Sequence, residues 1–379
     1  MTPDHCFKSR SLILVTVLVC GLGLFTHANA QVRHPFLVDL NSRSATEIGR
    51  STLENPSRAS GINDAGQVVG ESVTAEGGWH AFITGPDSMG MRQLGNLGES
   101  WSQSFSYDVN NAGQVVGTDP TGPPRAFITG PDGVGMRDLG SLGGGWSYAR
   151  GINDAGQVVG DSGAADGVGH AFITGPDGMG MRELGTLGGN GSNANGINDA
   201  GQVVGTSSTA EGNDHAFITG PDGVGMRDLG TLGGNWSRAF DINDAGQVVG
   251  QSSTAEGDWH AFITGSDGMG MRDLGTLGGQ YSYANGVNDA GQVVGTSLTA
   301  EGNPHAFITG PDGKGMVDLN SLVDLSEGVI LTRAAGINNN GQVIAMGVIP
   351  EPETYALMLA GLGLIGLMGG ARRRRNSHS

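Results

Sequence analysis

The ten-residue motif GINDAGQVVG constrains this chain more than any other feature, because it recurs along most of the sequence. Close copies begin at Gly61, Gly151, Gly196, Asp241 and Gly286, and weaker copies begin at Asp108 and Gly336. A second motif, HAFIT or a variant of it, lies between them and begins every 45 residues, at His80, Arg125, His170, His215, His260 and His305. A constant period of this length is the signature of a repeat architecture.

Each repeat predicts four short strands. In residues 283–320, a first strand ends in an NDAG turn, GQVVGTS is a β-branched second strand, HAFIT is a third, and MVDLN follows a GPDGKG turn. The first segment is rich in Ser, Ala, Asn and Gly, which suits the crowded axis of a ring, so we place it innermost. The 70 glycines and 6% aromatic residues fit short strands joined by tight turns. The predicted fold is therefore all-β, with each repeat forming one blade of a propeller.

The two ends of the repeat region complement each other. Residues 34–49 align with 125–140, the second half of a repeat, and residues 333–348 form a first half. Six complete repeats and one split repeat predict a seven-bladed β-propeller over residues 31–349, in which the N- and C-terminal half-blades close the ring. The alternative is a β-solenoid with two rungs per repeat, but an open stack needs distinct capping repeats and gains nothing from complementary ends.

Charge and cysteine content exclude several functions. The net charge is −17, and such a surface repels nucleic acid, whose binding depends on basic patches. Both cysteines, Cys6 and Cys20, lie near the N-terminus, so the repeats contain no disulfide and no cysteine-based metal or redox site.

The N-terminal segment, residues 1–30, is typical of a signal peptide. It has a basic start at Lys8 and Arg10, an apolar run over residues 11–25 and small residues at Ala28 and Ala30 before the expected cleavage point. We expect signal peptidase to release a mature chain that begins at Gln31; a signal anchor is the alternative.

The C-terminal segment, residues 350–379, has three parts: a Pro-Glu-Pro tripeptide, an apolar run and an arginine cluster. The 17 residues 355–371 are at the short limit for a transmembrane helix, and the arginines would keep the end of the chain in the cytoplasm. The order of these parts resembles a PEP-CTERM sorting tail, which implies a Gram-negative bacterium and cleavage by an exosortase; a permanent anchor is the alternative. The residues that carry the sorting motif are Pro350, Glu351, Pro352, Arg372, Arg373, Arg374 and Arg375.

The His-Ala-Phe triplets, together with the Asp-Leu-Gly motifs that follow them, resemble the extracellular HAF-repeat family. The resemblance covers about residues 61–318, and Arg125 and Pro35 depart from the triplet. It implies an exported repeat protein and brings no established reaction or ligand.

Three kinds of recurring residue are interpreted structurally. The histidines His34, His80, His170, His215, His260 and His305 lie on separate blades, too far apart to share a metal, and we expect them to form bonds within their own blades. The Asn-Asp-Ala-Gly segments lack the spaced carboxylates of a calcium loop and are interpreted as turns, with calcium binding left open. Phenylalanines that recur in every repeat, from Phe36 to Phe307, are expected to pack between neighbouring blades.

Candidate ligand-binding residues are aromatic side chains near the junctions between repeats. They are Trp101, Trp146, Trp236, Tyr281 and Tyr283, which could stack on sugar rings, contact a partner protein or pack between blades.

Catalysis needs a unique group of residues, which we sought where the copies differ. Residues 99–105, 119–125 and 320–332 do not combine a nucleophile with a base and an orienting group. No cofactor is expected. The predicted function is therefore a non-catalytic scaffold, exported to the cell surface or the extracellular matrix, that binds exopolysaccharide or protein partners. The alternative is a secreted propeller-type polysaccharide lyase or glycosidase, which would need acidic, His or Tyr groups converging on one face.

Overall fold

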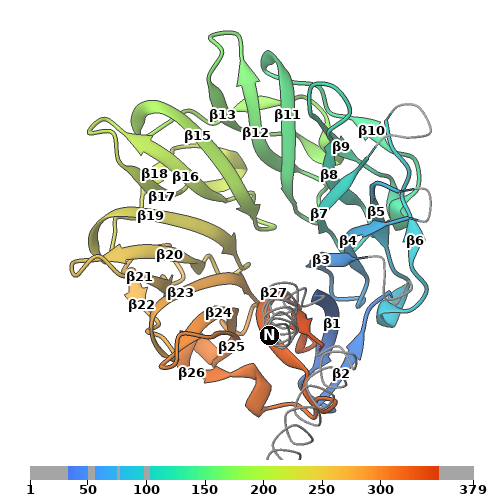
Figure 1. Ribbon diagram of the computed structural model, residues 1–379. Coiled ribbons are helices and arrows are strands. Elements are labelled where there is room, and N and C mark those ends of the chain that lie inside the picture. The colour runs from blue at the N-terminus through green and yellow to red at the C-terminus, as the bar shows by residue number, and fades with distance from the viewer. Residues whose placement is uncertain (1–32, 50–55, 75–76, 98–102, 350–379) are drawn as a thin grey trace, which may run out of the picture. The chain divides into compact units, whose positions relative to one another are not determined.

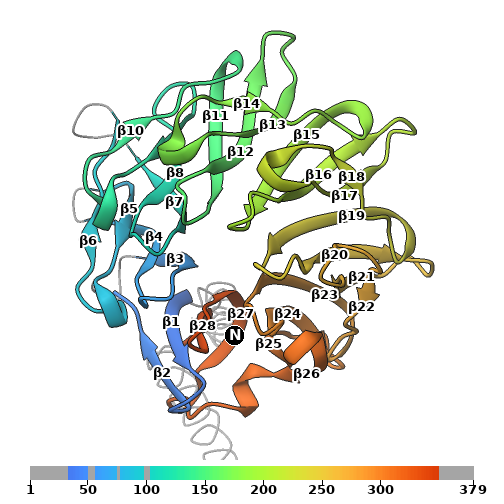
Figure 2. The ribbon, with the colours of Figure 1, turned by 180° about the vertical axis from the view of Figure 1, so that it is seen from behind.

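The repeats fold into successive four-stranded antiparallel sheets, which follow one another around a central axis (Figures 1 and 2). The computed structural model describes residues 33–49, 56–74, 77–97 and 103–349. Within these residues the regular structure is almost entirely strand, and no helix is long and apolar enough to cross a membrane.

Blades 1 to 3 run from the first complete repeat onward. Their strands are β3 (Ser57–Ile62), β4 (Val68–Val73), β5 (Trp79–Ile83) and β6 (Arg92–Gln93) in blade 1, β7 (Phe105–Val109), β8 (Val115–Asp119), β9 (Arg125–Ile128) and β10 (Arg137–Asp138) in blade 2, and β11 (Gly143–Ile152), β12 (Val158–Ala164), β13 (Gly169–Ile173) and β14 (Arg182–Glu183) in blade 3. In each blade the strands pair in sequence order, with the first strand innermost.

Blades 4 to 6 repeat this order. Their strands are β15 (Gly188–Ile197), β16 (Val203–Thr209), β17 (Asp214–Ile218) and β18 (Arg227–Asp228) in blade 4, β19 (Gly233–Ile242), β20 (Val248–Thr254), β21 (Trp259–Ile263) and β22 (Arg272–Asp273) in blade 5, and β23 (Gly278–Val287), β24 (Val293–Thr299), β25 (Pro304–Gly310) and β26 (Lys314–Asp318) in blade 6. A single parallel bridge between Trp259 and Tyr281 joins blades 5 and 6. Short 3-10 helices follow the third strands or link blades, at Pro86–Ser88, Pro131–Gly133, Pro176–Gly178, Pro221–Gly223, Pro311–Gly313 and Leu319–Ser321.

Blade 7 is built from both ends of the repeat region. Its inner strands are β27 (Ile330–Ile337) and β28 (Gln342–Val348), and its outer strands are β1 (Arg33–Asp39) and β2 (Ser44–Glu47). Strand β28 pairs with β1 along seven residues, from Arg33 opposite Val348 to Asp39 opposite Gln342. Figure 2 shows the first and last described strands side by side. The predicted pairing of the two half-repeats is therefore confirmed, and no edge of this blade is left open between the two ends of the repeat region.

In blades 1 to 6, a glycine on the second strand lies beside a bulge on the inner strand. The ladder between β11 and β12 shifts register between Ala149 and Gly151. This shift turns the carbonyl oxygen of Tyr148 toward Gly160, where a Cβ atom would lie only 1.9 Å from it. The last glycine of each VVG segment is thus required by a close backbone approach.

The recurring phenylalanines lie between blades. Phe172 packs with Ala126 and Ile128 of blade 2, and Phe217 packs with Ala171 and Ile173 of blade 3. Both phenylalanines are fully buried. The prediction that these rings hold neighbouring blades together is confirmed at these junctions.

The all-β propeller class is confirmed, and the remaining sequence predictions for the termini lie outside the described residues. These are the signal peptide at 1–30 and the sorting tail with its transmembrane helix at 350–379. The insertion 320–332, considered as a source of unusual chemistry, instead supports blade 7: the Asn320 side chain bonds the backbone of Leu331 in both directions, at 2.7 and 2.9 Å.

The importance of the phenylalanines can be tested in blade 4. We expect Phe217→Ala to lower the free energy of unfolding by about 3–5 kcal/mol, because it opens a cavity between two blades. His215→Gln should cost about 1 kcal/mol or less, since the partner of His215, Asp228, is partly exposed. Chemical denaturation of both variants measures the two costs, and a larger loss for His215→Gln would contradict this assignment.

Candidate functional site

A ring of asparagines surrounds the axis where the inner strands end. The side-chain amide of each asparagine donates to the backbone carbonyl of the asparagine in the next blade, at 2.9–3.4 Å. The series runs through Asn63, Asn110, Asn153, Asn198, Asn243, Asn288 and Asn338, and the last of these donates back to Asn63. Each is buried and also donates to a glutamine four residues later in its own turn. The NDAGQ segments are therefore turns, as expected, but they also join the blades.

A second, more exposed ring lies beside the first. Each backbone N–H of the next residue in these turns donates to a side-chain oxygen of the equivalent residue in the next blade, at 2.8–3.1 Å. Its members are Asp64, Asn111, Asp154, Asp199, Asp244, Asp289 and Asn339, which line a cavity at this end of the axis. Burial raises the pKa of Asp199, and the neighbouring carboxylates of Asp244 and Asp154 add to the rise. Across the described part of the chain, no His, Cys, Asp and Glu side chains are grouped so as to hold a metal ion.

Two further carboxylates, Asp108 and Asp241, lie on the inner strands where five other repeats have glycine. Asp108 accepts hydrogen bonds from the backbone N–H groups of Val109 and Ile152, and so links blades 2 and 3. Asp241 makes the equivalent pair of bonds between blades 5 and 6. Burial raises the pKa of Asp108 to about 7 and that of Asp241 to about 6, while these hydrogen bonds act in the opposite direction.

One pair of facing positions differs widely from blade to blade, and we call these the variable positions. The inner-strand members are Arg58, Phe105, Tyr148, Asn193, Arg238, Tyr283 and Arg333, and the second-strand residues opposite them are Glu71, Thr118, Asp161, Thr206, Gln251, Thr296 and Met346. Each inner-strand member precedes the ring asparagine by five residues, about 15 Å along a strand. The variable positions therefore lie toward the other end of the axis from the asparagine ring.

In blades 1 to 3 the charges at and beside these positions compensate one another. Arg58 lies 3.7 Å from Glu71 and stacks over Trp79 at 5.0 Å from the ring centroid, and Arg150 lies 2.6 Å from Asp161. Burial raises the pKa of Glu71, and Arg58 acts against the rise. We call Arg58, Glu71, Tyr107, Tyr148, Arg150 and Asp161 the neutralised cluster. Burial also raises the pKa of Tyr107. The charge of Arg150 acts against this rise, and the charges of Glu71 and Asp161 add to it.

In blades 5 and 7 the arginines at the variable positions, Arg238 and Arg333, form no ion pair with any acidic residue that the structure describes. Gln251 stands opposite Arg238, and Met346 opposite Arg333. The Tyr281 hydroxyl donates to the Gln251 side-chain oxygen at 3.2 Å, and the Tyr281 and Tyr283 rings are 5.5 Å apart in an edge-to-face arrangement. We call Arg238, Gln251, Tyr281, Tyr283 and Arg333 the arginine–tyrosine cluster.

The structure separates the four predicted ligand-face residues that it describes. Tyr281 and Tyr283 lie together in the arginine–tyrosine cluster. Trp146 is on blade 3 and lies against Gly163 and Gly169 of its own blade, whereas Trp236 on blade 5 is 39% exposed. Trp101 lies outside the described residues. The arginines at the variable positions were missed, although comparing the repeats position by position would have revealed them.

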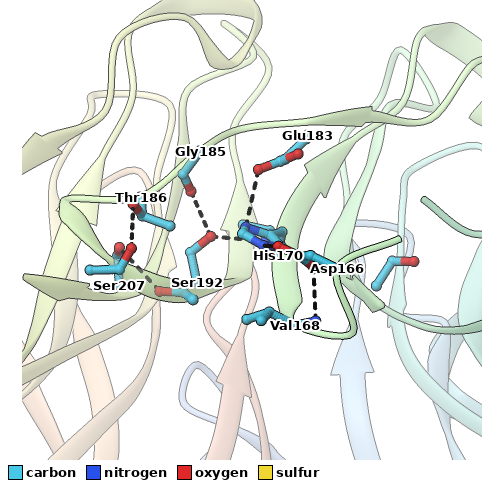
Figure 3. A network of polar contacts seen from close by, with 12 residues as sticks. Asp166, Val168, His170, Glu183, Gly185, Thr186, Ser192 and Ser207 are labelled. Atoms are coloured by element: carbon cyan, nitrogen blue, oxygen red, sulfur yellow. Dashed lines mark hydrogen bonds and ion pairs between the residues drawn. The ribbon is translucent and has the colours of Figure 1, made fainter. Parts of the chain in front are cut away.

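Five of the six recurring histidines pair with carboxylates on the fourth strand of their own blade. The exception is His80, whose blade has Gln93 at the equivalent position and whose buried Nδ1 atom has no hydrogen-bond partner among the described residues. The Nδ1 atoms of His34, His170, His215, His260 and His305 lie 2.6–3.0 Å from Glu47, Glu183, Asp228, Asp273 and Asp318 respectively. Figure 3 shows His170 between Glu183 and Asp166, beside Ser192. The serine hydroxyl accepts from the backbone N–H of Ala171 in the preceding blade and donates to the carbonyl of Gly185. These residues join strands and blades, which supports the structural interpretation of the histidines.

Comparison with known proteins identifies the tail. A family model described as the PEP-CTERM protein-sorting motif matches residues 348–375, which indicates an exported protein that passes through the membrane. The match does not extend into the repeats, so the resemblance to the HAF-repeat family stays a prediction. No curated protein sequence matches this chain.

Similar solved structures share the fold at low sequence identity. An oligogalacturonate lyase in complex with manganese is 9% identical and aligns over 86% of this chain and 99% of its own, with a TM-score of 0.51. A puromycin-hydrolyzing peptidase of Mycobacterium tuberculosis is 12% identical over 75% of this chain and 48% of its own, with a TM-score of 0.50. A putative TolB from Agrobacterium tumefaciens is 10% identical over 85% of this chain and 100% of its own, with a TM-score of 0.45. Such likeness concerns the fold alone.

The raised pKa of Asp108 predicts a pH-dependent stability. Because its folded-state pKa of about 7 exceeds the ordinary value of 3.8, the folded protein holds a proton there that the unfolded chain releases. The contribution of this carboxyl to the free energy of unfolding is fully present below pH about 4 and is lost as the pH rises through about 7. Asp108→Gly, which restores the residue of five other repeats, should therefore gain stability relative to the wild type as the pH rises from 4 to 7. Asp241→Gly should behave similarly with a window ending near pH 6. Chemical denaturation at several pH values measures this. A difference in unfolding free energy between wild type and variant that stays constant across the range would contradict the assignment.

Proposed function

We propose that this protein is an exported, non-catalytic scaffold of the cell surface or extracellular matrix that binds exopolysaccharide or protein partners through its variable positions. The observation that carries this proposal is the contrast between those positions and the rest of each blade. The asparagines, serines and phenylalanines that join the blades recur nearly unchanged, whereas aromatic and charged side chains at and beside the variable positions differ from blade to blade. Exposed aromatic and arginine side chains are typical anchors of binding surfaces.

The acidity of the chain supports the same assignment. With a net charge of −17, the protein has little affinity for nucleic acid and stays soluble once exported. Calcium binding at the turn carboxylates remains compatible with this role and is not required by it.

A glycan array probed with the full-length protein tests the proposal. We expect binding to a subset of polysaccharides and a loss of about tenfold or more in affinity for Tyr283→Ala, because an aromatic anchor at a variable position is removed. Val224→Ala is the control, since Val224 is 65% exposed on an outer turn and lies outside the variable positions. Equal losses for the two variants, or no binding to any glycan or matrix protein, would contradict the proposal.

The alternative function, a secreted polysaccharide lyase or glycosidase, finds its best candidate residues in the neutralised cluster. Glu71 and Tyr107 there both have raised pKa values, caused first by burial, which is a property of groups that exchange protons in catalysis. The ion pairs of Glu71 and Asp161 with arginines favour a structural role instead. Release of shortened or unsaturated oligosaccharides by the wild type, and not by Glu71→Gln, would favour the enzyme.

We further propose that the tail directs export by transient anchoring and cleavage. Four arginines after a short apolar segment would halt it in the inner membrane, because each costs about 2.5–3.5 kcal/mol to move into hydrocarbon. Pro350 and Pro352 disfavour helix and would keep the preceding peptide extended for an exosortase.

Cleavage near Pro350 then predicts that the extracellular form lacks Arg372, Arg373, Arg374 and Arg375. Mass spectrometry of secreted protein tests this, with a variant carrying four glutamines at these positions as the comparison; that precursor should be misoriented or retained. Recovery of an extracellular peptide that ends at Ser379 would mean that the tail is a permanent anchor.

A further inference from the structure

The variable positions give arginine a different electrostatic role on the two sides of the ring. In blades 1 and 3, Arg58 and Arg150 are paired with the carboxylates of Glu71 and Asp161. On the other side, Arg238 and Arg333 are exposed and make no side-chain hydrogen bond or ion pair with any other described residue. The positions opposite them are occupied by the uncharged Gln251 and Met346. The acidic chain thus retains two uncompensated positive charges on this surface.

Tyr281 lies between these two arginines. The Tyr281 hydroxyl donates to the side chain of Gln251. Gln251 is the residue directly opposite Arg238 in blade 5, so Arg238 lies near the aromatic ring of Tyr281. On the other side, Asn285 of the same strand donates to the carbonyl of Ala334, next to Arg333, at 2.7 Å. Burial raises the pKa of the Tyr281 hydroxyl, and Tyr283 adds to the rise. The positive charges of Arg238 and Arg333 act in the opposite direction. A single parallel backbone bridge also joins Tyr281 to Trp259 of blade 5.

We propose that the arginine–tyrosine cluster binds acidic saccharide, with Arg238 and Arg333 pairing with its carboxylates and with Tyr281 and Tyr283 contacting the sugar rings. A guanidinium matches the planar carboxylate of a uronate with two parallel hydrogen bonds, and it binds most strongly where no protein carboxylate competes. Aromatic rings present apolar faces that suit the C–H faces of a sugar, while the Tyr281 hydroxyl is already held by Gln251. The neutralised cluster, whose arginines are occupied, does not meet these requirements.

This inference rests on the proposed function, because it names the class of polysaccharide that the scaffold binds. The two can fail separately: a scaffold specific for neutral glycans would retain the proposed function and lose the inference.

The experiment compares an oligogalacturonate with its carboxyl-reduced, neutral form by isothermal titration calorimetry on the full-length protein. We expect the wild type to bind the acidic oligomer at least about tenfold more tightly. Arg238→Gln and Arg333→Gln should each lose about tenfold for the acidic oligomer and leave binding of the neutral one unchanged, and the double variant should lose more than either. Arg58→Gln is the matched control, because it removes the same charge at the same position of a blade where that charge is already paired; its affinity should stay within about twofold. Circular dichroism melting of each variant establishes that the ring is intact.

Four outcomes overturn the inference. Equal binding of the acidic and reduced oligomers by the wild type leaves the proposed function standing and removes the acidic specificity. Equal losses for Arg58→Gln and Arg238→Gln would mean that overall charge, and not this cluster, attracts the ligand. Tighter binding of an oligoglutamate of the same charge would assign the cluster to an acidic peptide, and binding of neither oligomer would remove both the inference and the saccharide branch of the proposed function.

Discussion

The closed ring of asparagine hydrogen bonds is the constraint on which the rest of this structure depends. Each buried amide satisfies its own turn through a glutamine and the next blade through a backbone carbonyl, so every blade is fixed relative to its neighbour by the same contact. Removing one partner would leave a buried donor or acceptor unsatisfied, which costs about 1–3 kcal/mol. The ring closes only because Asn338 and Asn63, at opposite ends of the repeats, meet as neighbours.

The same constraint explains how a glycine-rich chain without disulfides in its repeats holds together. Glycine raises the entropy lost on folding, and in blades 1 to 6 a close carbonyl oxygen of the bulged inner strand leaves no room for a Cβ atom at the second-strand glycine. Phenylalanines between blades supply the compensating apolar burial, and β1 on β28 leaves no free half-blade at which the ring could open. The close backbone contacts within the blades and the pairing of β1 with β28 therefore stabilise the same closed ring.

The sequence predicted what depends on period and pattern, and missed what depends on geometry between repeats. The 45-residue spacing was enough to predict the four-stranded blades, the pairing of residues 34–49 with the C-terminal half-repeat and the burial of Phe172 and Phe217. Asn153 bonding to the next blade could not be predicted, since it requires the relative placement of two turns. Among the candidate site residues, the sequence identified Tyr281 and Tyr283 as aromatics. It did not identify Arg238, whose charge is unpaired because Gln251 lies opposite it. That pairing depends on the strand register, which the bulge at residues 239–241 sets.

A ring of near-identical blades also limits where function can arise. The asparagines, serines and phenylalanines that join blades cannot vary without breaking a contact that is repeated around the axis, whereas side chains at the variable positions meet few such demands. Exchanging glutamate for glutamine opposite an arginine, as between blades 1 and 5, leaves the backbone ladder unchanged and converts a neutral ion pair into a free positive charge. Binding specificity can therefore change one blade at a time while the ring that presents it stays the same.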